Sequence, residues 1–174
     1  MRLAISNLDP RRILGVPAVY NTFQKLTRTR EYRRRFMEGV PVGPGSRVLE
    51  VGCGPGTNFE FLAPRPDVRY VGCDSDTIYI AHARQRFGDR AEFIAAPVGE
   101  LRALGQRRFN TALAWGLLHH IRDADVRTLA AEIADLLEPG GSFCTFDPCF
   151  TERQPLVERL LTASERTSLL HMHI

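Results

Sequence analysis

Three glycines at alternate positions follow a short apolar run in the segment Val48–Gly56, which reads VLEVGCGPG. Glycine permits positive φ angles, and because it has no Cβ the backbone can approach a ligand closely at Gly52, Gly54 and Gly56. A helical pattern begins at about Thr57, so the free N–H groups and the positive dipole end of that helix face the same crevice. A strand, a glycine turn and a helix in this order predict a nucleotide-like binding site. A tight turn without a ligand is the alternative interpretation.

Strands and helices alternate along the chain on both sides of this segment. The predicted strands are Arg47–Val51, Arg69–Cys73, Glu92–Ala95, Asn110–Trp115 and Ser142–Phe146. The predicted helices between them are Thr57–Ala63, Asp76–Phe87, Val98–Leu104 and Asp123–Glu138. Such alternation is typical of parallel strands joined by right-handed crossovers, with helices on both faces of the sheet. The predicted fold class is therefore α/β, a three-layer α/β/α fold around a mostly parallel five-stranded sheet.

Apolar periodicity predicts which faces of two of these helices point toward the sheet. In the helix Asp76–Phe87, the residues expected to face inward are Ile78, Ala81 and Phe87. In the helix 123–138, the residues expected to face inward are Val126, Leu129, Ala130, Ile133, Leu136 and Leu137. Asp123 is expected to cap this second helix, and the sequence PGG at 139–141 is expected to end it.

The chain of 174 residues is interpreted as one domain with an extension at each end. Residues 1–44 are expected to form an N-terminal helical extension and linker, with a helix from Pro17 to about Met37 and a proline- and glycine-rich stretch after it. Residues 45–150 are expected to form the core domain. Residues 151–174 are expected to form a C-terminal helix that is truncated.

Five arginines crowd the N-terminal helix at Arg28, Arg30, Arg33, Arg34 and Arg35. A run of charges is typical of a solvated helix face, and attraction to an anionic substrate or to nucleic acid is the alternative. The formal net charge of the chain is only +3, which does not indicate a nucleic-acid partner. We therefore expect these arginines to lie in solvent.

Composition excludes several other classes of protein. The sequence contains no run of about 18 apolar residues, so no membrane span is expected. The first residues lack the apolar stretch and cleavage site of a signal peptide, so we expect a cytoplasmic protein. The cysteines Cys53, Cys73, Cys144 and Cys149 form no C-x-x-C pair and have no zinc-site spacing. They are expected to be small core thiols in a reducing compartment.

Spacing and charge around the glycine turn discriminate between nucleotides. The dinucleotide fingerprint G-x-G-x-x-G/A would place its third small residue at position 57, where this chain has Thr57. Glu50, directly ahead of the turn, would repel a pyrophosphate, whereas S-adenosylmethionine carries an ammonium and a sulfonium cation that an acid attracts. A nicotinamide-dependent oxidoreductase is disfavoured for both reasons. Glu50 as a structural acceptor for N–H groups of the turn stays open, and the two roles are compatible.

A second acid, Asp74, ends the second predicted strand 22 positions after Gly52. An acid about 20 residues beyond the first glycine accepts hydrogen bonds from a ribose diol in nucleotide-binding folds. The alternative is that Asp74 caps the following helix. Asp76 is the better candidate for the cap because it lies closer to the first periodic apolar residue.

Four segments in order resemble the motifs of class I S-adenosylmethionine-dependent methyltransferases, namely Val48–Gly56, Tyr70–Asp76, Phe109–Ile121 and Leu137–Pro148. The resemblance covers residues 45–150. It implies that Glu50 and the turn residues Gly52, Cys53, Gly54 and Gly56 hold the amino-acid part of the cofactor.

The same resemblance assigns the rest of the cofactor site. Asp74 would hold the ribose hydroxyls, with Ser75 next to it among the cofactor contacts. Ala96, Pro97 and Val98 would flank the adenine, and Trp115 would lie beside the cofactor at the end of the fourth strand. These assignments are expectations from the resemblance, and no metal is expected.

The sequence departs from the family pattern in three places. Ala96 stands where an acid often accepts from the adenine amino group, and Asn110 stands where an acid is common. After the fifth strand, 27 residues follow Asp147, and they contain no β-branched strand pair for the usual C-terminal antiparallel hairpin. One helix is expected there, from the apolar residues Leu156, Val157, Leu160, Leu161, Leu169 and Leu170. The fifth strand would be an uncovered edge that could pair with a second copy, so a homodimer is expected as one outcome.

The resemblance implies methyl transfer to a small-molecule acceptor. Holding the acceptor in line with the methyl group can supply roughly 7–11 kcal/mol, so no base is required for every acceptor. His119 and His120 are candidate bases, although packing or backbone hydrogen bonding is the more common role of such a histidine. Tyr20 and Phe23 could set the choice of acceptor, with plain packing as the alternative. A protein that binds the cofactor without turnover is the competing function.

Overall fold

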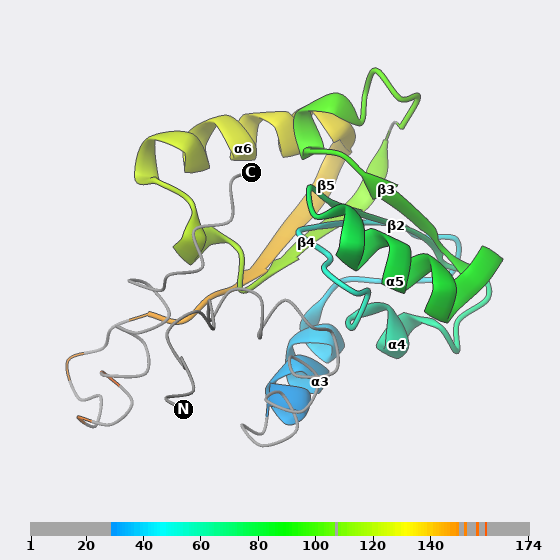
Figure 1. The fold of residues 1–174 in the computed structure, drawn as a ribbon, viewed down its shortest axis with the longest axis horizontal. Helices are drawn as coiled ribbons and strands as arrows, with labels where there is room; N and C mark the ends of the chain where they lie inside the picture. Colours follow the sequence, from blue (N-terminus) through cyan, green and yellow to red (C-terminus); the bar gives the residue numbers. More distant parts are fainter. Residues whose placement is uncertain (1–28, 107, 150–151, 153–155, 157–158, 160–174) are drawn as a thin grey trace, which may run out of the picture.

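The computed structural model describes residues 29–106, 108–149, 152, 156 and 159 (Figure 1). In this part of the chain five strands form one sheet in the order β3-β2-β1-β4-β5, and every neighbouring pair is parallel. The strands are β1 (Arg47–Val51), β2 (Arg69–Asp74), β3 (Glu92–Ala95), β4 (Phe109–Trp115) and β5 (Leu137–Phe146). The predicted parallel five-stranded sheet is confirmed.

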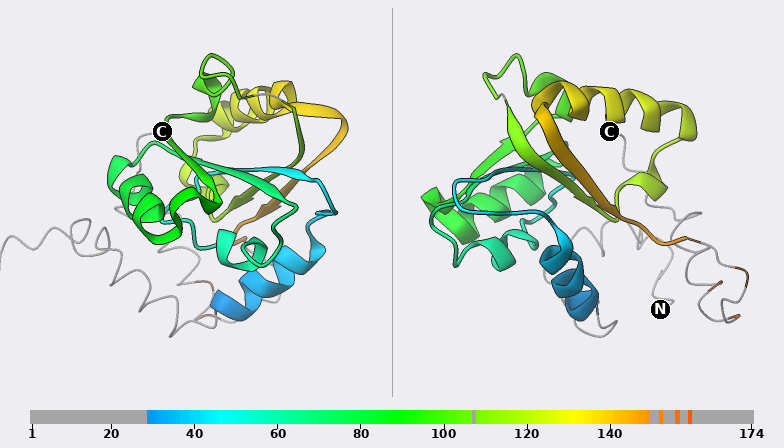
Figure 2. Two further views of the ribbon diagram at one scale, coloured as in Figure 1. Left: turned by 90° about the vertical axis from the view of Figure 1, so that its right-hand side faces the viewer. Right: turned by 180° about the vertical axis from the view of Figure 1, so that it is seen from behind.

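Helices cover both faces of the sheet. The α-helices are α3 (Thr29–Gly39), α4 (Phe59–Leu62), α5 (Thr77–Phe87) and α6 (Asp123–Leu136), and short 3-10 turns occur at η1 (Gly88–Arg90), η2 (Val98–Glu100) and η3 (Leu118–His120). Helices α3, α4 and α5 contribute to one core cluster with Val48, and α6 and η2 contribute to a second one with Leu49. Figures 1 and 2 show α6 on the opposite side of the sheet from α5. The three-layer α/β/α prediction is confirmed.

The chain reverses its direction of travel across the sheet after β3. It runs outward from the central strand β1 to β2 and β3, and it then returns to the other side of β1 to form β4 and β5. In open parallel sheets, ligands bind outside the carboxyl ends of the strands at such a switch point. The segments that follow β1, β2, β3 and β4 are therefore the ones that can form a site.

The inward face of α5 differs from the prediction. Ile80, Ala83 and Phe87 are buried, whereas Ile78 is 65% exposed and Ala81 is also exposed. The buried residues follow one helical stripe at spacings of three and four, which ends on Phe87. Ile78 and Ala81 lie on the neighbouring stripe, so the prediction for these two residues was wrong.

The junction of α6 and β5 also differs from the prediction. The helix ends at Leu136 instead of Glu138, and β5 begins at once with Leu137. The segment 139–141 lies inside β5, where the register against β4 shifts between Phe109 and Thr111. The proline and glycines therefore form an irregularity in the strand and do not end the helix.

The predicted cap and inward face of α6 are confirmed only in part. Arg122 is the N-cap residue, and Asp123 lies in the first turn without capping it. The buried residues of this helix are Leu129, Ile133 and Leu136. Of the other residues expected inward, Ala130 is exposed, and Val126 and Leu137 are half-buried.

The N-terminal arginines are divided between two environments on α3. Arg34 and Arg35 form exposed ion pairs with Glu31, as expected for a solvated face. Arg33, however, is only 3% exposed, so the prediction that this arginine lies in solvent was wrong. Arg28, Tyr20, Phe23 and nearly all of the predicted C-terminal helix lie outside the described residues.

Candidate functional site

The glycine turn after β1 adopts the conformation that its sequence predicts. Gly52, Gly54 and Gly56 have φ angles of 68°, 52° and 75°, which side-chain-bearing residues rarely adopt. A Cβ on Gly52 would lie 2.9 Å from Leu117, and one on Gly56 would lie 2.9 Å from a ring carbon of Phe93. A Cβ on Gly54 would meet nothing within 4 Å, so this glycine faces open space.

The helix that follows the turn is shorter than predicted. Helix α4 spans only Phe59–Leu62, whereas the expectation was Thr57–Ala63. A single turn has a small dipole, and the N–H groups of Phe59 and Phe61 already donate to the carbonyls of Gly56 and Asn58. The helix terminus therefore contributes less to the site than the sequence suggested.

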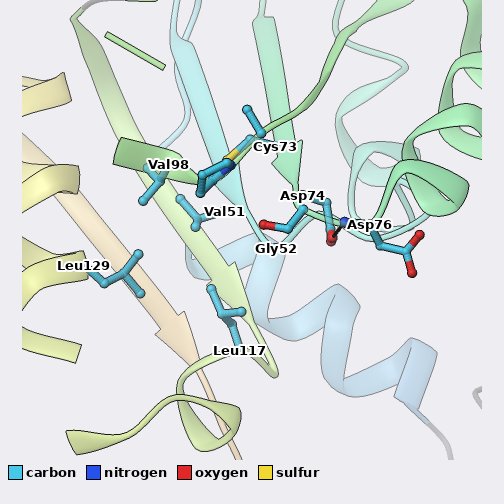
Figure 3. Close-up of a pocket in the computed structure, with 11 residues that line it drawn as sticks. Val51, Gly52, Cys73, Asp74, Asp76, Val98, Leu117 and Leu129 are labelled. Atoms are coloured by element: carbon cyan, nitrogen blue, oxygen red, sulfur yellow. Dashed lines mark hydrogen bonds between the residues drawn. The ribbon is translucent and has the colours of Figure 1, made fainter. Parts of the chain in front are cut away.

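A pocket of about 250 Å³ opens beside the turn, at the carboxyl ends of β1, β2 and β3 (Figure 3). Its walls carry apolar side chains from several elements, and one end carries acidic and hydroxyl groups. Its lining residues are Val51, Gly52, Cys73, Asp74, Ser75, Asp76, Ala96, Pro97, Val98, Leu117 and Leu129. Small-molecule sites are commonly clefts of this kind, apolar with a few convergent polar groups.

Asp74 is held at the polar end of this pocket. Its Oδ2 accepts a hydrogen bond from the Gly54 N–H at 2.8 Å, and its Oδ1 accepts one from the Asp76 N–H at 2.8 Å. Burial raises the pKa of Asp74, and the two backbone hydrogen bonds oppose this shift. Each carboxylate oxygen can accept a further hydrogen bond, so the group can still serve a ligand.

The cap of α5 is Asp76, as predicted. Its Oδ1 accepts hydrogen bonds from the N–H groups of Ile78 at 2.7 Å and Tyr79 at 3.2 Å. Asp74 is therefore not required as the cap, and its side chain ties the glycine turn to the end of β2.

Glu50 belongs to a different group of residues, which we call the polar cluster and define as Arg33, Asn58, Glu50 and Tyr70. Asn58 Nδ2 donates to Glu50 Oε1 at 2.5 Å, and the hydroxyl of Tyr70 donates to Oε2. Arg33 Nη1 donates to Asn58 Oδ1 at 2.6 Å. All four residues are buried. Glu50 therefore acts as a structural acceptor, although for side chains and not for the N–H groups of the turn.

The polar cluster changes the acidity of Glu50. Burial raises the pKa of Glu50 from 4.5 to about 7, against the opposing effects of the Tyr70 hydrogen bond and the charge of Arg33. Burial also raises the pKa of Tyr70, and the Glu50 carboxylate adds to that shift. A carboxyl group with these properties exchanges its proton near neutral pH.

Trp115 lies at the carboxyl end of β4, between α3 and β5. Its ring stacks on Phe146 with centroids 4.2 Å apart and an interplanar angle of 4°. The ring of Phe36 meets it edge-on at 5.3 Å, and the guanidinium of Arg33 lies 4.6 Å from its centroid. Trp115 is therefore an aromatic contact between the N-terminal helix and the last strand.

A histidine and an aspartate join the ends of β4 and β5. His119 Nδ1 lies 2.8 Å from Asp147 Oδ1, and the backbone N–H of His119 donates to the same oxygen at 3.2 Å. The ring of His120 lies 3.9 Å from that of His119. His119 thus bonds a carboxylate, a partner that its place in the sequence did not predict, and a catalytic role for it stays an open alternative.

The pocket brings together six of the predicted cofactor residues, namely Gly52, Asp74, Ser75, Ala96, Pro97 and Val98. The predicted residues Glu50, Cys53, Gly54, Gly56 and Trp115 do not line it. The cofactor residues predicted from the sequence do not include the lining residues Val51, Cys73, Asp76, Leu117 and Leu129. Three of these are immediate neighbours of predicted residues at strand ends, which is the signal that could have found them.

The described part of the chain contains neither a metal-binding cluster nor a membrane-spanning helix. No group of three or more His, Cys, Asp or Glu side chains is arranged to hold a metal ion there. None of the described helices is long and apolar enough to span a membrane. The four cysteines form no disulfide, and Cys53 and Cys73 are buried core thiols as expected, whereas Cys149 is exposed.

The residues of the pocket fit a nucleoside. Val51, Val98, Leu117 and Leu129 offer apolar surface to a flat base, and the carboxylate of Asp74 lies at the polar end, where a ribose diol could donate to it. Ala96 is buried and carries no acceptor for an adenine amino group. A parallel α/β sheet with a glycine turn after β1 and an acid at the end of β2 defines a nucleoside-binding domain of the Rossmann-like class.

Comparison with known families identifies the domain further. A family described as a methyltransferase domain matches residues 48–141, which is more than half of the chain. The chain therefore belongs to this family of methyltransferase domains. The predicted class I S-adenosylmethionine-dependent methyltransferase domain is confirmed by the family and by the fold.

Known proteins resemble parts of the chain. The trans-aconitate 2-methyltransferase of Paracidovorax citrulli is 37% identical over 83 residues, which cover 47% of this chain and 31% of that protein. A TehB-like methyltransferase of Corynebacterium glutamicum has a similar structure, with a TM-score of 0.58 at 18% identity, and the match covers 86% of this chain and 83% of that one. The glycopeptide N-methyltransferase MtfA, solved with S-adenosylmethionine, has a TM-score of 0.54 at 26% identity over 66% of this chain and 52% of that one.

The match to curated relatives is partial. The chain spans between 26% and 35% of the length of the first four of them. Those relatives contain further sequence outside the match, so their substrates are not assigned to this chain. The matches therefore show the family and the fold of this chain, and they do not identify its methyl acceptor.

Proposed function

We propose that this domain binds S-adenosylmethionine in the pocket beside the glycine turn and transfers its methyl group to a small-molecule acceptor. The observation that carries the proposal is Asp74, buried at the polar end of the pocket and tied to the turn through the Gly54 N–H. When bound, the cofactor supplies a methyl group on a sulfonium, which is already activated for transfer. The ribose would be held by Asp74 and Ser75, and the adenine by Ala96, Pro97 and Val98.

The acceptor is proposed to bind on the other half of the same edge of the sheet. Trp115 and Phe146 end β4 and β5 there, and Phe146 is 40% exposed. Phe146 and the half-buried ring of Trp115 provide a surface on which an acceptor can be oriented, beside the largely buried His119–Asp147 pair. Because orientation alone lowers the barrier substantially, the task of these residues is positioning.

Thermal unfolding with three ligands tests the proposal. S-adenosylmethionine or its demethylated product, at 100 times its dissociation constant, is expected to add about 2.7 kcal/mol to the unfolding free energy. NAD is expected to have no effect, because Thr57 interrupts the dinucleotide fingerprint. A stabilisation by NAD alone would overturn the proposal.

A second candidate function is cofactor binding without turnover. It is favoured by Ala96, which leaves the adenine amino group without a carboxylate acceptor at the end of β3. Stabilisation by S-adenosylmethionine, combined with no methyl transfer to a broad panel of small hydroxyl, amine and carboxylate acceptors, would support this second function over the first.

Strand β5 lies at one edge of the sheet and can pair with a further strand. Within the described residues β5 pairs with β4 only, and its outer edge carries unpaired backbone groups. We propose that a second copy of the chain can pair there, and light scattering on the purified protein tests this through the molecular mass. A monomer at all concentrations would contradict it. A cytoplasmic location stays a prediction.

A further inference from the structure

Arg33 on α3 is a buried cation whose hydrogen-bonding capacity is mostly unused. The residue is 3% exposed, and its Nη1 donates to Asn58 Oδ1 at 2.6 Å. Its Nε and Nη2 are also buried, and neither has a hydrogen-bond partner among the described residues. Leaving charged donors buried without partners costs free energy, so this arrangement calls for an anion.

The next residue on the same helix shows what the two unused nitrogens can do. Arg34 uses its Nε and Nη2 together to bind both carboxylate oxygens of Glu31, at 3.0 and 2.8 Å. These two nitrogens form one edge of the planar guanidinium, which matches the geometry of a carboxylate. Arg33 presents the same edge without a carboxylate on it. The chemistry that fits this edge of Arg33 is therefore that of a carboxylate.

The carboxylates near Arg33 do not fill this edge. Glu50 interacts with Arg33 through Asn58, and its two oxygens accept from Asn58 and Tyr70. Glu31 pairs with Arg34 and Arg35 on the exposed side of α3. The free edge of Arg33 is therefore available to a group that is not part of the described protein.

The position of Arg33 relates this edge to the proposed site. Its guanidinium lies over the ring of Trp115, at the carboxyl end of β4, and its partner Asn58 directly precedes α4 after the glycine turn. The amino-acid part of the cofactor is expected at that turn, and the acceptor at the end of β4. A carboxylate from either molecule would come close to Arg33.

We propose that the Nε and Nη2 atoms of Arg33 form a carboxylate-binding subsite at the loop end of the site. The inference rests on the proposed function and adds to it the residue that holds the carboxylate. The expected source is the amino-acid part of S-adenosylmethionine, and a carboxylate of the methyl acceptor is the second source. Because both nitrogens are buried beneath α3, binding requires this helix to move and then holds it in place.

The first experiment measures the affinities of S-adenosylmethionine and of its decarboxylated analogue by calorimetry. The wild-type protein is expected to bind S-adenosylmethionine at least about tenfold more tightly. Arg33→Met is expected to lose this preference, with weaker binding of S-adenosylmethionine and unchanged binding of the analogue. Unchanged binding of the analogue also shows that the variant is folded.

A matched control is available on the same helix. Arg35 is 68% exposed, and Arg35→Met removes the same charge while Arg34 keeps its pairing with Glu31. This control is expected to bind both ligands as the wild-type protein does. If Arg33→Met does not fold, Arg33→Lys replaces it, because lysine retains the charge without the two parallel donors. Its preference for S-adenosylmethionine over the analogue is expected to fall severalfold, a smaller loss than that of Arg33→Met.

The second experiment distinguishes the two sources of the carboxylate. The protein is saturated with the demethylated cofactor and titrated with trans-aconitate, a tricarboxylate probe. Trp115 is the one tryptophan of the sequence and lies beneath the Arg33 guanidinium, so its fluorescence reports on this subsite. If Arg33→Met keeps the preference for S-adenosylmethionine but loses the response to trans-aconitate, the carboxylate belongs to the acceptor.

The remaining outcomes decide against one proposal or the other. If Arg33→Met changes neither the cofactor preference nor the trans-aconitate response, the carboxylate subsite is overturned. If the wild-type protein binds neither S-adenosylmethionine nor its analogue, the proposed function fails. In that case, the trans-aconitate titration without cofactor tests the carboxylate subsite at Arg33 independently of cofactor binding.

Discussion

Two acids at the ends of neighbouring parallel strands have different surroundings in this domain. Asp74 ends β2 in the pocket, where its partners are the backbone N–H groups of Gly54 and Asp76. Glu50 lies one residue before the end of β1, and its partners are the side chains of Asn58 and Tyr70. Both carboxyl groups are buried, and burial raises both pKa values. Only Asp74 lines the pocket.

The difference follows from how far along its strand each acid lies. Val48 belongs to the core cluster on the α3, α4 and α5 side, and Leu49 and Val51 belong to the cluster on the α6 side. Glu50 is therefore on the side of Val48, and because it pairs in register with Gly72, two residues before Asp74, both acids belong to the same face of the sheet. Glu50 lies inside the sheet, where Asn58 and Tyr70 occupy its two oxygens, whereas Asp74 is the last residue of β2 and reaches the pocket from the end of its strand.

Replacing Glu50 by alanine is the strongest test of this comparison. The variant leaves the Tyr70 hydroxyl and the Asn58 amide without an acceptor and removes the carboxyl group that interacts with the charge of Arg33. Breaking a buried charged network from one side costs about 3–5 kcal/mol, so the unfolding free energy in urea is expected to fall by that amount. Glu50→Gln keeps one acceptor oxygen and is expected to lose less. A loss below about 1 kcal/mol for Glu50→Ala would mean that the polar cluster does not stabilise the fold.

The pH dependence of stability tests the same group without changing its size. Burial raises the pKa of Glu50 from 4.5 to about 7, so the folded protein binds this proton more tightly than the unfolded chain does. The contribution of this proton to the free energy of unfolding is therefore complete below pH 4.5. It is lost as the pH rises through 7, by roughly 3 kcal/mol in total.

The comparison between wild type and Glu50→Gln isolates this contribution. Asp74, whose pKa is also raised, changes stability in the same direction in both proteins, so the difference between the two curves reports on Glu50. Urea unfolding at several pH values from 4.5 to 7.5 measures it. A wild-type stability that rises with pH relative to the glutamine variant would contradict the raised pKa.

The same contrast shows how far the sequence determines the site. The place of Asp74 in the pocket could be predicted because it depends on one local relation, the spacing from the glycine turn to the end of the next strand. The surroundings of Glu50 depend on Arg33, Asn58 and Tyr70, which come from three separate elements. No spacing rule connects these residues, so the sequence indicated an acid near the cofactor and not its partners.

Errors in the fold have a similar origin. The apolar pattern of α5 allows two neighbouring stripes, and only the packing of Ile80, Ala83 and Phe87 against the sheet selects between them. The burial of Arg33 could not be predicted from a run of arginines, because it depends on Trp115 and on Asn58. The order of elements was predictable because it follows from local patterns, whereas these choices depend on contacts that are distant in sequence.

Asp74→Ala tests the other half of the comparison and has the smallest expected effect. Each hydrogen bond from a ribose hydroxyl to the carboxylate contributes about 1.5–3 kcal/mol, so the affinity for S-adenosylmethionine measured by calorimetry is expected to fall tenfold or more. Glu50→Gln is the matched control, since it changes a buried acid that does not line the pocket and is expected to leave this affinity nearly unchanged. If the two variants lost affinity equally, the pocket and the polar cluster would act as one unit. Asp74 would then support the site by holding the turn through Gly54, without binding the ribose.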